Sequence, residues 1–156
     1  MTKSNRRNAG FTMIEIITVL VLIGIVTVVV VGRQISVNTE LHSQVSAVKT
    51  HIRYAQSLCM NSDITWGICC DGSDYWLFKD GDTGDQVRLP GENSSTVDLS
   101  DKDISMDTFT VSFTEKGVPC TDDGATVTQS GDRNISISAG GDSESITITQ
   151  NTGYIP

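Results

Sequence analysis

The chain opens with ten largely polar residues and then becomes almost continuously apolar. The run FTMIEIITVLVLIGIVTVVVV, residues 11–31, holds Glu15 as its single charge. Its 21 residues would rise about 30 Å as an α-helix, which is the thickness of the hydrocarbon core of a bilayer. The pattern therefore predicts a membrane-spanning helix over residues 11–31.

Beyond this run the apolar positions become periodic, mostly at steps of three and four, as on one face of a helix. They are Ile35, Val37, Leu41, Val45, Val48, Ile52, Ala55 and Cys59. No proline lies between Phe11 and Met60. We therefore predict one continuous helix of about 50 residues, roughly 75 Å long, whose second half, residues 32–61, lays an apolar stripe against a domain. Gly24 and Gly32 are its weak points, since glycine costs up to ~1 kcal/mol relative to alanine in a helix.

From residue 62 onward the sequence changes to short strand patterns. Strands are predicted at 64–70 and 75–80, joined by a turn at 71–74, and at 108–113, 125–130, 134–139 and 145–150. Alternating apolar and polar residues mean that one face of a sheet is buried, and in TFTVSF the buried set would be Phe109, Val111 and Phe113. One long helix followed by an antiparallel sheet predicts an α+β domain over residues 62–156, covered by the apolar stripe.

Charge is distributed unevenly along the chain. The basic residues Lys3, Arg6 and Arg7 precede the apolar run, whereas all 19 acids lie at or after Glu15. Without residues 1–10, 8 basic residues (11 minus 3) face 19 acidic ones, a net charge of −11. Positive charge holds the leading end of a membrane helix in the cytoplasm, so the acidic body is expected to be exported. Its acidity argues against binding nucleic acid and favours a soluble exported domain.

A cleaved secretory signal peptide is the alternative to an anchor. Such a signal has an apolar core of roughly 7 to 15 residues, followed by a small-residue cleavage site. Here the apolar core, residues 16–31, is longer, and Gly32-Arg33-Gln34 follows it without an Ala-x-Ala pattern. An anchor fits better.

The residues around Glu15 carry a more specific pattern. The basic leader, residues 1–10, followed by the run Gly10, Phe11, Thr12, Met13, Ile14 and Glu15, resembles the processing site of type IV pilins and of the pseudopilins of type II secretion. The resemblance implies the pilin fold and a single-pass protein of the inner membrane. It implies that prepilin peptidase cuts between Gly10 and Phe11 and methylates the new N-terminus, and that the chain assembles with other pilin or pseudopilin subunits.

A physical argument agrees with this resemblance. Cleavage would create an ammonium at Phe11 in or near the membrane, one helical turn from Glu15. Pairing the two charges offsets part of the large desolvation penalty of each. Within the family this pairing is thought to form between neighbouring subunits as a filament grows. The alternative is an ordinary anchored protein whose Glu15 snorkels toward the headgroups.

A looser resemblance concerns the kind of subunit. The segments IRYAQSLCMNSDITWGICCDGSDYWLFKDGD and SITITQNTGYIP resemble the minor pseudopilin H of type II secretion and the fimbrial minor pilins. A minor pilin or pseudopilin is therefore the leading prediction. A major pilin that builds the whole fibre and an adhesive or DNA-uptake pilin are the alternatives, the last disfavoured by the acidic body. Many pilins place a proline where this chain has Gly32, so no kink is predicted there.

Four cysteines lie in the part expected to be exported: Cys59, Cys69, Cys70 and Cys120. An even number outside the cytoplasm favours disulfides. Neighbouring residues of a strand point to opposite faces, so a bond between Cys69 and Cys70 would be strained. We therefore expect Cys59 to bridge to Cys69 or Cys70, and Cys120 to take the other. A metal site built on these cysteines is disfavoured, because there is no Cys-x-x-Cys motif.

The stretch DGDTGD is a weak candidate for calcium through Asp80, Asp82 and Asp85, although it lacks the EF-hand pattern and a solvated turn is the preferred reading. No catalytic motif is present, neither Gly-x-Ser-x-Gly nor His-Glu-x-x-His, and His42 and His51 are not spaced to lie side by side on a helix. We therefore expect neither enzymatic activity nor a cofactor.

Overall fold

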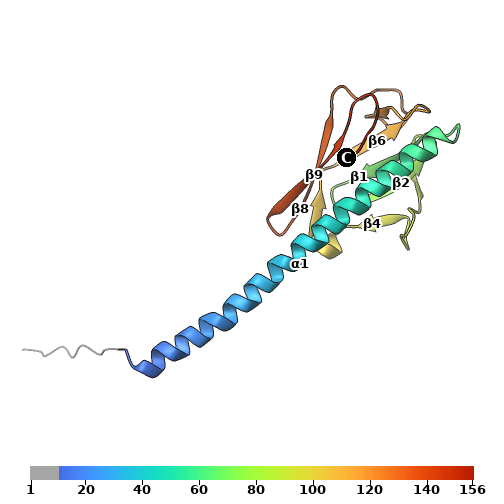
Figure 1. The fold of residues 1–156 in the computed structure, drawn as a ribbon. Helices are drawn as coiled ribbons and strands as arrows, with labels where there is room; N and C mark the ends of the chain where they lie inside the picture. The colour runs from blue at the N-terminus through green and yellow to red at the C-terminus, as the bar shows by residue number, and fades with distance from the viewer. Residues whose placement is uncertain (1–10) are drawn as a thin grey trace, which may run out of the picture. The chain divides into compact units, whose positions relative to one another are not determined.

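The computed structural model describes residues 11–156, with the side chains of residues 29–38 outside the described set (Figure 1). One helix, α1 (Met13–Met60), precedes an antiparallel β domain, so the predicted α+β pilin architecture is confirmed. The helix is continuous over 48 residues. The chain forms two compact units, Met1–Ser36 and Val37–Pro156. The predicted leader, residues 1–10, lies outside the described residues.

The strands of the second unit form two sheets, and all of their pairings are antiparallel. The first sheet has the order β3-β2-β1-β6-β7, and β4 also pairs with β2. Its strands are β1 (Trp66–Cys70), β2 (Asp74–Lys79), β3 (Asp82–Val87), β4 (Thr96–Asp98), β6 (Phe109–Phe113) and β7 (Pro119–Cys120). The second sheet has the order β5-β8-β9, with β5 (Ile104–Met106), β8 (Arg133–Ala139) and β9 (Asp142–Ile148). A short 3₁₀ helix, η1 (Ser100–Lys102), precedes β5.

The predicted apolar stripe of the helix is the centre of the core. Its described members are at most 4 % exposed: Leu41, Val45, Val48, Ile52, Ala55 and Cys59. They belong to one hydrophobic cluster with inward-facing residues of both sheets, including Ile68 of β1 and Ile137 of β8. Phe109, Val111 and Phe113 of β6 are buried in the same cluster, as their alternation predicts. Ile35 and Val37, the other predicted members, lie outside the residues described with side chains.

A chain of buried and part-buried hydrogen bonds links α1 to β2 and to η1. Lys102 Nζ donates to Gln44 Oε1 at 3.0 Å, and Gln44 Nε2 donates to the Tyr75 hydroxyl at 3.3 Å. His51 lies 3.0 Å from that hydroxyl through Nδ1 and 3.2 Å from the Pro90 carbonyl through Nε2. A carbonyl only accepts, so Nε2 carries the proton, and Tyr75 donates to Nδ1. Each buried group of the chain thereby has a partner, which fixes where α1 lies on β2.

The outer face of the first sheet is also covered. Phe78 alternates with the inward-facing Leu77, is fully buried, and lies opposite Gly67. A β-carbon at Gly67 would collide with the ring of Phe78 and with the Val111 carbonyl, so the position needs glycine. Ser112 donates its hydroxyl to the Asp122 carbonyl, which brings segment 121–128 onto this face.

The strand predicted at 125–130 does not form. Ala125 has a φ of 54°, and the Asp122 carboxylate accepts hydrogen bonds from the backbone N–H groups of Thr126 and Val127 at 2.8 to 3.1 Å. These side-chain bonds compete with pairing in a sheet. Apart from one bridge between Cys120 and Thr128, the segment is a loop.

Candidate functional site

The helix carrying Glu15 begins with a reciprocal pair of hydrogen bonds. The Glu15 N–H donates to Thr12 Oγ1 at 3.3 Å, and the Thr12 N–H donates to Glu15 Oε2 at 3.5 Å. Since α1 begins at Met13, Thr12 is the N-cap and Glu15 the third helical residue, which is the capping box. Glu15 therefore stabilises the start of its own helix. This role was not predicted, although Thr-x-x-Glu is the signature of a capping box.

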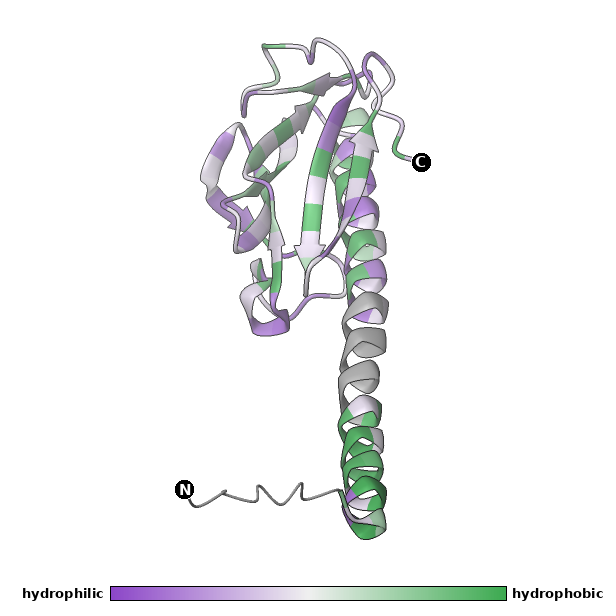
Figure 2. Cartoon of the chain, turned by 90° about the vertical axis from the view of Figure 1, so that its left-hand side faces the viewer, coloured by the Kyte–Doolittle hydropathy of each residue, from purple (hydrophilic) through white to green (hydrophobic). Residues whose placement is uncertain are grey.

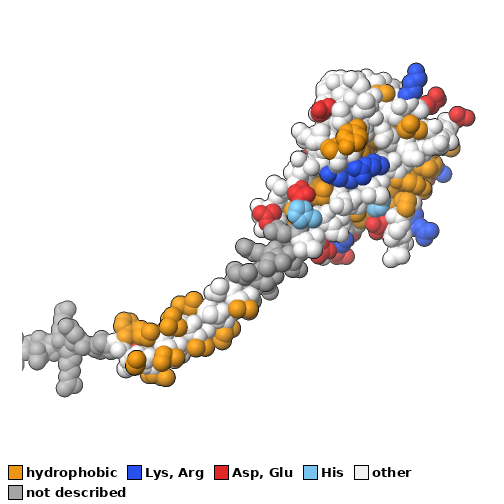
Figure 3. All heavy atoms as spheres, in the orientation of Figure 1, with side chains coloured by type: hydrophobic (Ala, Val, Ile, Leu, Met, Phe, Trp, Pro, Cys, Tyr) orange, Lys and Arg blue, Asp and Glu red, His pale blue; other side chains and the backbone are white. Residues whose placement is uncertain are grey.

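The side chains that follow Glu15 are apolar on all sides of the helix. Every large apolar side chain from Phe11 to Val28 is exposed, from 47 % at Val19 to 86 % at Met13. Figure 2 shows hydrophobic residues around this part of α1, and Figure 3 shows their side chains on the surface facing the viewer. A helix that is hydrophobic all round requires an apolar environment. This segment therefore calls for a cover by lipid or by other protein chains.

The two threonines in this segment bond to their own helix. Thr18 Oγ1 donates to the Ile14 carbonyl and Thr27 Oγ1 to the Ile23 carbonyl, each at 2.8 Å. A hydroxyl without a partner would be costly in an apolar environment. Both are paired locally, and Glu15 is the one charged side chain between residues 13 and 28.

Among the residues described with their side chains, we find no helical segment that combines the length and the apolar character needed to cross a membrane. Residues 29–31 of the span predicted over 11–31 lie outside that set. The span therefore stays a prediction.

The three residues predicted for processing and assembly are described to different extents. Gly10 lies outside the described residues. Phe11 is 80 % exposed and precedes the helix. Glu15 is exposed, on the first turn of α1.

The structure contains no disulfide among Cys59, Cys69, Cys70 and Cys120, so the predicted disulfides stay a prediction. The Cys59 thiol contacts Trp66 at the start of β1, accepting from its N–H at 3.0 Å and donating to its carbonyl at 3.1 Å. Cys70 ends that strand, four residues or about 13 Å further on. Cys120 lies on β7, two strands away from β1, or about 10 Å. Bridging needs Cα atoms within about 7 Å, so these strand spacings do not favour the predicted pairings.

Burial keeps three of these thiols protonated. It raises the pKa of Cys59 and of Cys120, and it raises that of Cys70 to about 11. Since the thiolate is the nucleophile and the metal ligand, these side chains are inert packing groups.

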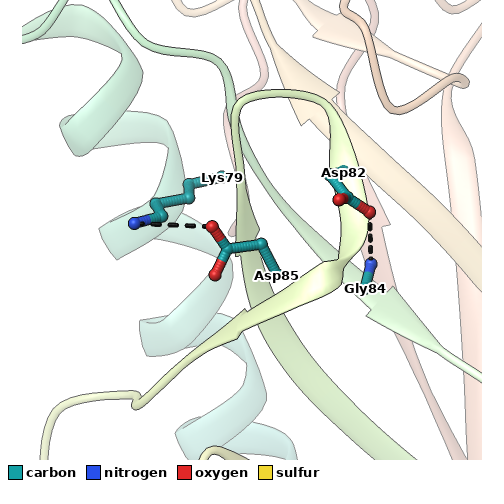
Figure 4. Close-up of polar contacts among 4 residues, drawn as sticks. All are labelled: Lys79, Asp82, Gly84 and Asp85. Atoms are coloured by element: carbon teal, nitrogen blue, oxygen red, sulfur yellow. Dashed lines mark hydrogen bonds and ion pairs between the residues drawn. The ribbon is translucent and has the colours of Figure 1, made fainter.

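The weak calcium candidates Asp82 and Asp85 make their polar contacts within their own hairpin, as Figure 4 shows. Asp82 Oδ1 accepts the Gly84 N–H at 2.8 Å, and Asp85 pairs with Lys79 at 3.4 Å. Asp80, with φ 57°, lies in the turn between β2 and β3. The part of the chain described with side chains contains no group of three or more His, Cys, Asp or Glu residues that could hold a metal ion.

The two histidines have separate structural contacts. His42 pairs with Glu144 of β9 on the surface, whereas His51 belongs to the buried chain through Tyr75. As their spacing predicts, they do not form a joint site.

The helix-on-sheet fold is consistent with the pilin fold, and the family comparison supports a type IV pilin-like N-terminal signal. Residues 5–31 match the family model described as the prokaryotic N-terminal methylation motif. This match includes Gly10, Phe11 and Glu15. No curated protein and no solved structure matches the chain.

Proposed function

We propose that this protein is a minor pilin or pseudopilin, a structural subunit of a type IV pilus or of a type II secretion pseudopilus. It is inserted in the inner membrane as a single-pass precursor with its C-terminal domain exported. Prepilin peptidase cuts it between Gly10 and Phe11, and the mature chain joins a filament with other pilin or pseudopilin subunits. The main support for the proposal is the match of residues 5–31 to the methylation motif. The helix that begins within this motif is apolar on all sides.

Glu15 supplies the assembly interaction in this proposal. The apolar surface of residues 11–28 has no counterpart among the described residues of the first unit, and a neighbouring helix of the same kind would cover it. The methylated amine of a mature Phe11 would be the partner of Glu15 in such a bundle, where pairing offsets the desolvation of both charges. In the uncleaved chain the Glu15 carboxylate bonds to the Thr12 N–H instead.

The capping box allows the charge of Glu15 to be tested separately from its capping role. Glu15→Gln keeps an oxygen that can accept from the Thr12 N–H but removes the charge, whereas Thr12→Val removes the hydroxyl cap and keeps the charge. We expect Glu15→Gln and Glu15→Ala to be processed normally and to be lost from filaments by at least about tenfold, since an unpaired ammonium in an apolar site costs more than ~1.4 kcal/mol. Thr12→Val should be incorporated, with a helix start weakened by about 1 kcal/mol.

The intact mass of the protein is measured in the membrane fraction and in sheared filaments. Incorporation is the ratio of the amount of mature chain in filaments to its amount in the membrane. A mass that begins at methylated Phe11 supports the processing step. Normal incorporation of Glu15→Gln would contradict the charge pairing, and a native mass that retains residues 1–10 would contradict the proposed function itself.

A further inference from the structure

A hollow in the β domain lies around the end of α1. A cavity of about 470 Å³ is bordered by the α1–β1 connection, by the β6–β7 turn and by the loop that follows β7. A second hollow of about 410 Å³ adjoins it and shares Cys59, Asp63 and Glu115. We call the two together the helix-end groove. Its size lies within the range of sites that bind small molecules or side chains of a partner, roughly 300–1,000 Å³.

The lining of the helix-end groove is mixed in polarity, and a few apolar side chains form part of it. Phe113 and Val118 line it from the β6–β7 side, and Ile64 lines it from the other side at 39 % exposure. Met60, at the end of α1, is 55 % exposed and borders the second hollow. Exposed apolar side chains gathered at a hollow mark interaction sites more often than single ones do.

The charges at the groove are unpaired. Asp63 and Glu115 border both hollows, and neither has an ion-pair or side-chain hydrogen-bond partner among the described residues. Elsewhere in the domain Asp85 is paired with Lys79 and Glu144 with His42. Lys116 is the one cation in the lining of either hollow. Two unpaired carboxylates beside apolar side chains complement a cation that is attached to an apolar group.

Hydrogen bonds within the protein hold both sides of the groove in place without a ligand. On one side, the Gly117 N–H donates to the Thr114 carbonyl at 2.8 Å, and Gln56 donates to the Gly117 carbonyl at 2.8 Å. On the other side, Asp122 fixes the loop that holds Ala125 at positive φ. Although partial burial works against it, the hydrogen bonds from Thr126 and Val127 lower the pKa of Asp122, so its carboxylate stays ionised. A preformed groove loses less conformational entropy on binding.

We propose that the helix-end groove binds an extended segment of a partner polypeptide that presents an apolar side chain next to a Lys or Arg. The apolar side chain enters between Ile64 and Val118, and the cation lies between Asp63 and Glu115. Thiol chemistry plays no part, because Cys59 is 2 % exposed and its thiol bonds to Trp66. This inference concerns the β domain alone and does not depend on filament incorporation.

The test uses the full chain in detergent micelles and three fluorescein-labelled nine-residue peptides on a Gly-Ser background. Their central pairs are Leu-Arg, Leu-Glu and Ser-Arg, and empty micelles correct for partitioning. Fluorescence anisotropy should show saturable binding of the Leu-Arg peptide and much weaker binding of the other two. Asp63→Lys and Glu115→Lys should each weaken Leu-Arg binding by about fivefold. Asp142→Lys, an equal change in charge at an exposed acid of β9, should leave it unchanged.

The Leu-Glu peptide and the Glu115→Lys variant together test the same contact with the two charges exchanged. The Leu-Glu peptide should bind this variant more tightly than it binds the unchanged chain. The inference is overturned if the three peptides bind alike, if none binds, or if Asp142→Lys weakens binding as much as the groove variants do. Displacement of the peptide by calcium chloride at constant ionic strength would overturn it in favour of a cation site. Failure of this titration leaves the proposed filament function intact, and failure of the Glu15 experiment leaves the groove intact.

Discussion

Tyr75 shows how one hydroxyl can organise the contact between helix and sheet. The hydroxyl oxygen accepts a hydrogen bond from Gln44, and the hydroxyl donates a hydrogen bond to His51. These two residues are a little under two turns apart on α1. Burial, and then the charge of Glu92, raise the pKa of Tyr75 well above its usual value. The folded protein therefore holds the neutral phenol where an unfolded tyrosine would ionise.

Tyr75→Phe should lower the free energy of unfolding by about 1–3 kcal/mol at neutral pH, because it leaves Gln44 and His51 without their buried partner. Above about pH 10 an unfolded tyrosine loses its proton while folded Tyr75 keeps it, so the stability of the unchanged protein falls as pH rises. The variant should show a shallower fall. Urea unfolding at pH 7 and pH 10.5 measures both effects.

Tyr54→Phe is the matched control, since Tyr54 is 37 % exposed and on the same helix. It should leave the stability at pH 7 within about 0.5 kcal/mol of the unchanged protein. Equal losses for the two variants would contradict the role assigned to Tyr75.

Among the secondary-structure elements, those whose apolar residues recur at a regular spacing can be predicted from the sequence. The helix stripe from Leu41 to Cys59 repeats every three or four residues, and β6 alternates, so both were predicted with the correct buried face. The turn at 71–74 was predicted from its Asp and Gly residues, and Asp71 Oδ1 does accept the Ser73 and Asp74 N–H groups. These signals are local, which is why the sequence alone reveals them.

Elements that depend on distant contacts were not predicted. β3 is a polar edge strand, DTGDQV, and it exists because it pairs with β2. The segment 125–130 alternates like a strand, yet Asp122 holds it as a loop. The predicted cysteine pairing is not confirmed, since strand positions in space, rather than the number of cysteines, decide which thiols can meet. Of the candidate site, Glu15 was found from the sequence, but its bond to Thr12 was not.

Asp122→Ala should release the loop that forms one side of the helix-end groove. The backbone N–H groups of Thr126 and Val127 lose a charged acceptor, a hydrogen bond of about 1.5–3 kcal/mol each. We expect amide hydrogen exchange in 123–128 to accelerate by at least about tenfold, with little change in β1 and β2.

Asp123→Ala is the control for this experiment, because Asp123 is exposed and its carboxylate makes no hydrogen bond within the described part of the chain. Unchanged exchange in Asp122→Ala would show that the loop is held by other contacts. Faster exchange throughout the sheet would show that Asp122 supports the whole domain instead.

At the scale of the molecule, the β domain contains its own core. Every member of the hydrophobic cluster lies between Leu41 and Ile155, within the second compact unit. The end of the chain is part of this unit, since Arg53 donates to the Ile155 carbonyl at 2.6 Å and Ile155 is 1 % exposed. The apolar side chains of residues 11–28 contribute nothing to this cluster.

We therefore expect a fragment of residues 37–156 to fold alone as a soluble protein with one cooperative thermal transition. Circular dichroism and size-exclusion chromatography would measure the transition and the state of association. A parallel fragment that ends at residue 149 should be less stable, because it lacks Ile155 and its bond to Arg53. A fragment 37–156 that aggregates or melts without cooperativity would contradict an autonomous core.

The bonds of Thr18 and Thr27 to their own helix have a further consequence. A side chain that keeps the same hydrogen bond in lipid and in protein contributes little to the enthalpy of transferring the helix from one to the other. In the filament subunit proposed above, Glu15 would then be the side chain whose interactions change most when the helix moves between lipid and protein. We therefore expect the proposed filament to disassemble as well as grow, without any covalent change to the subunit.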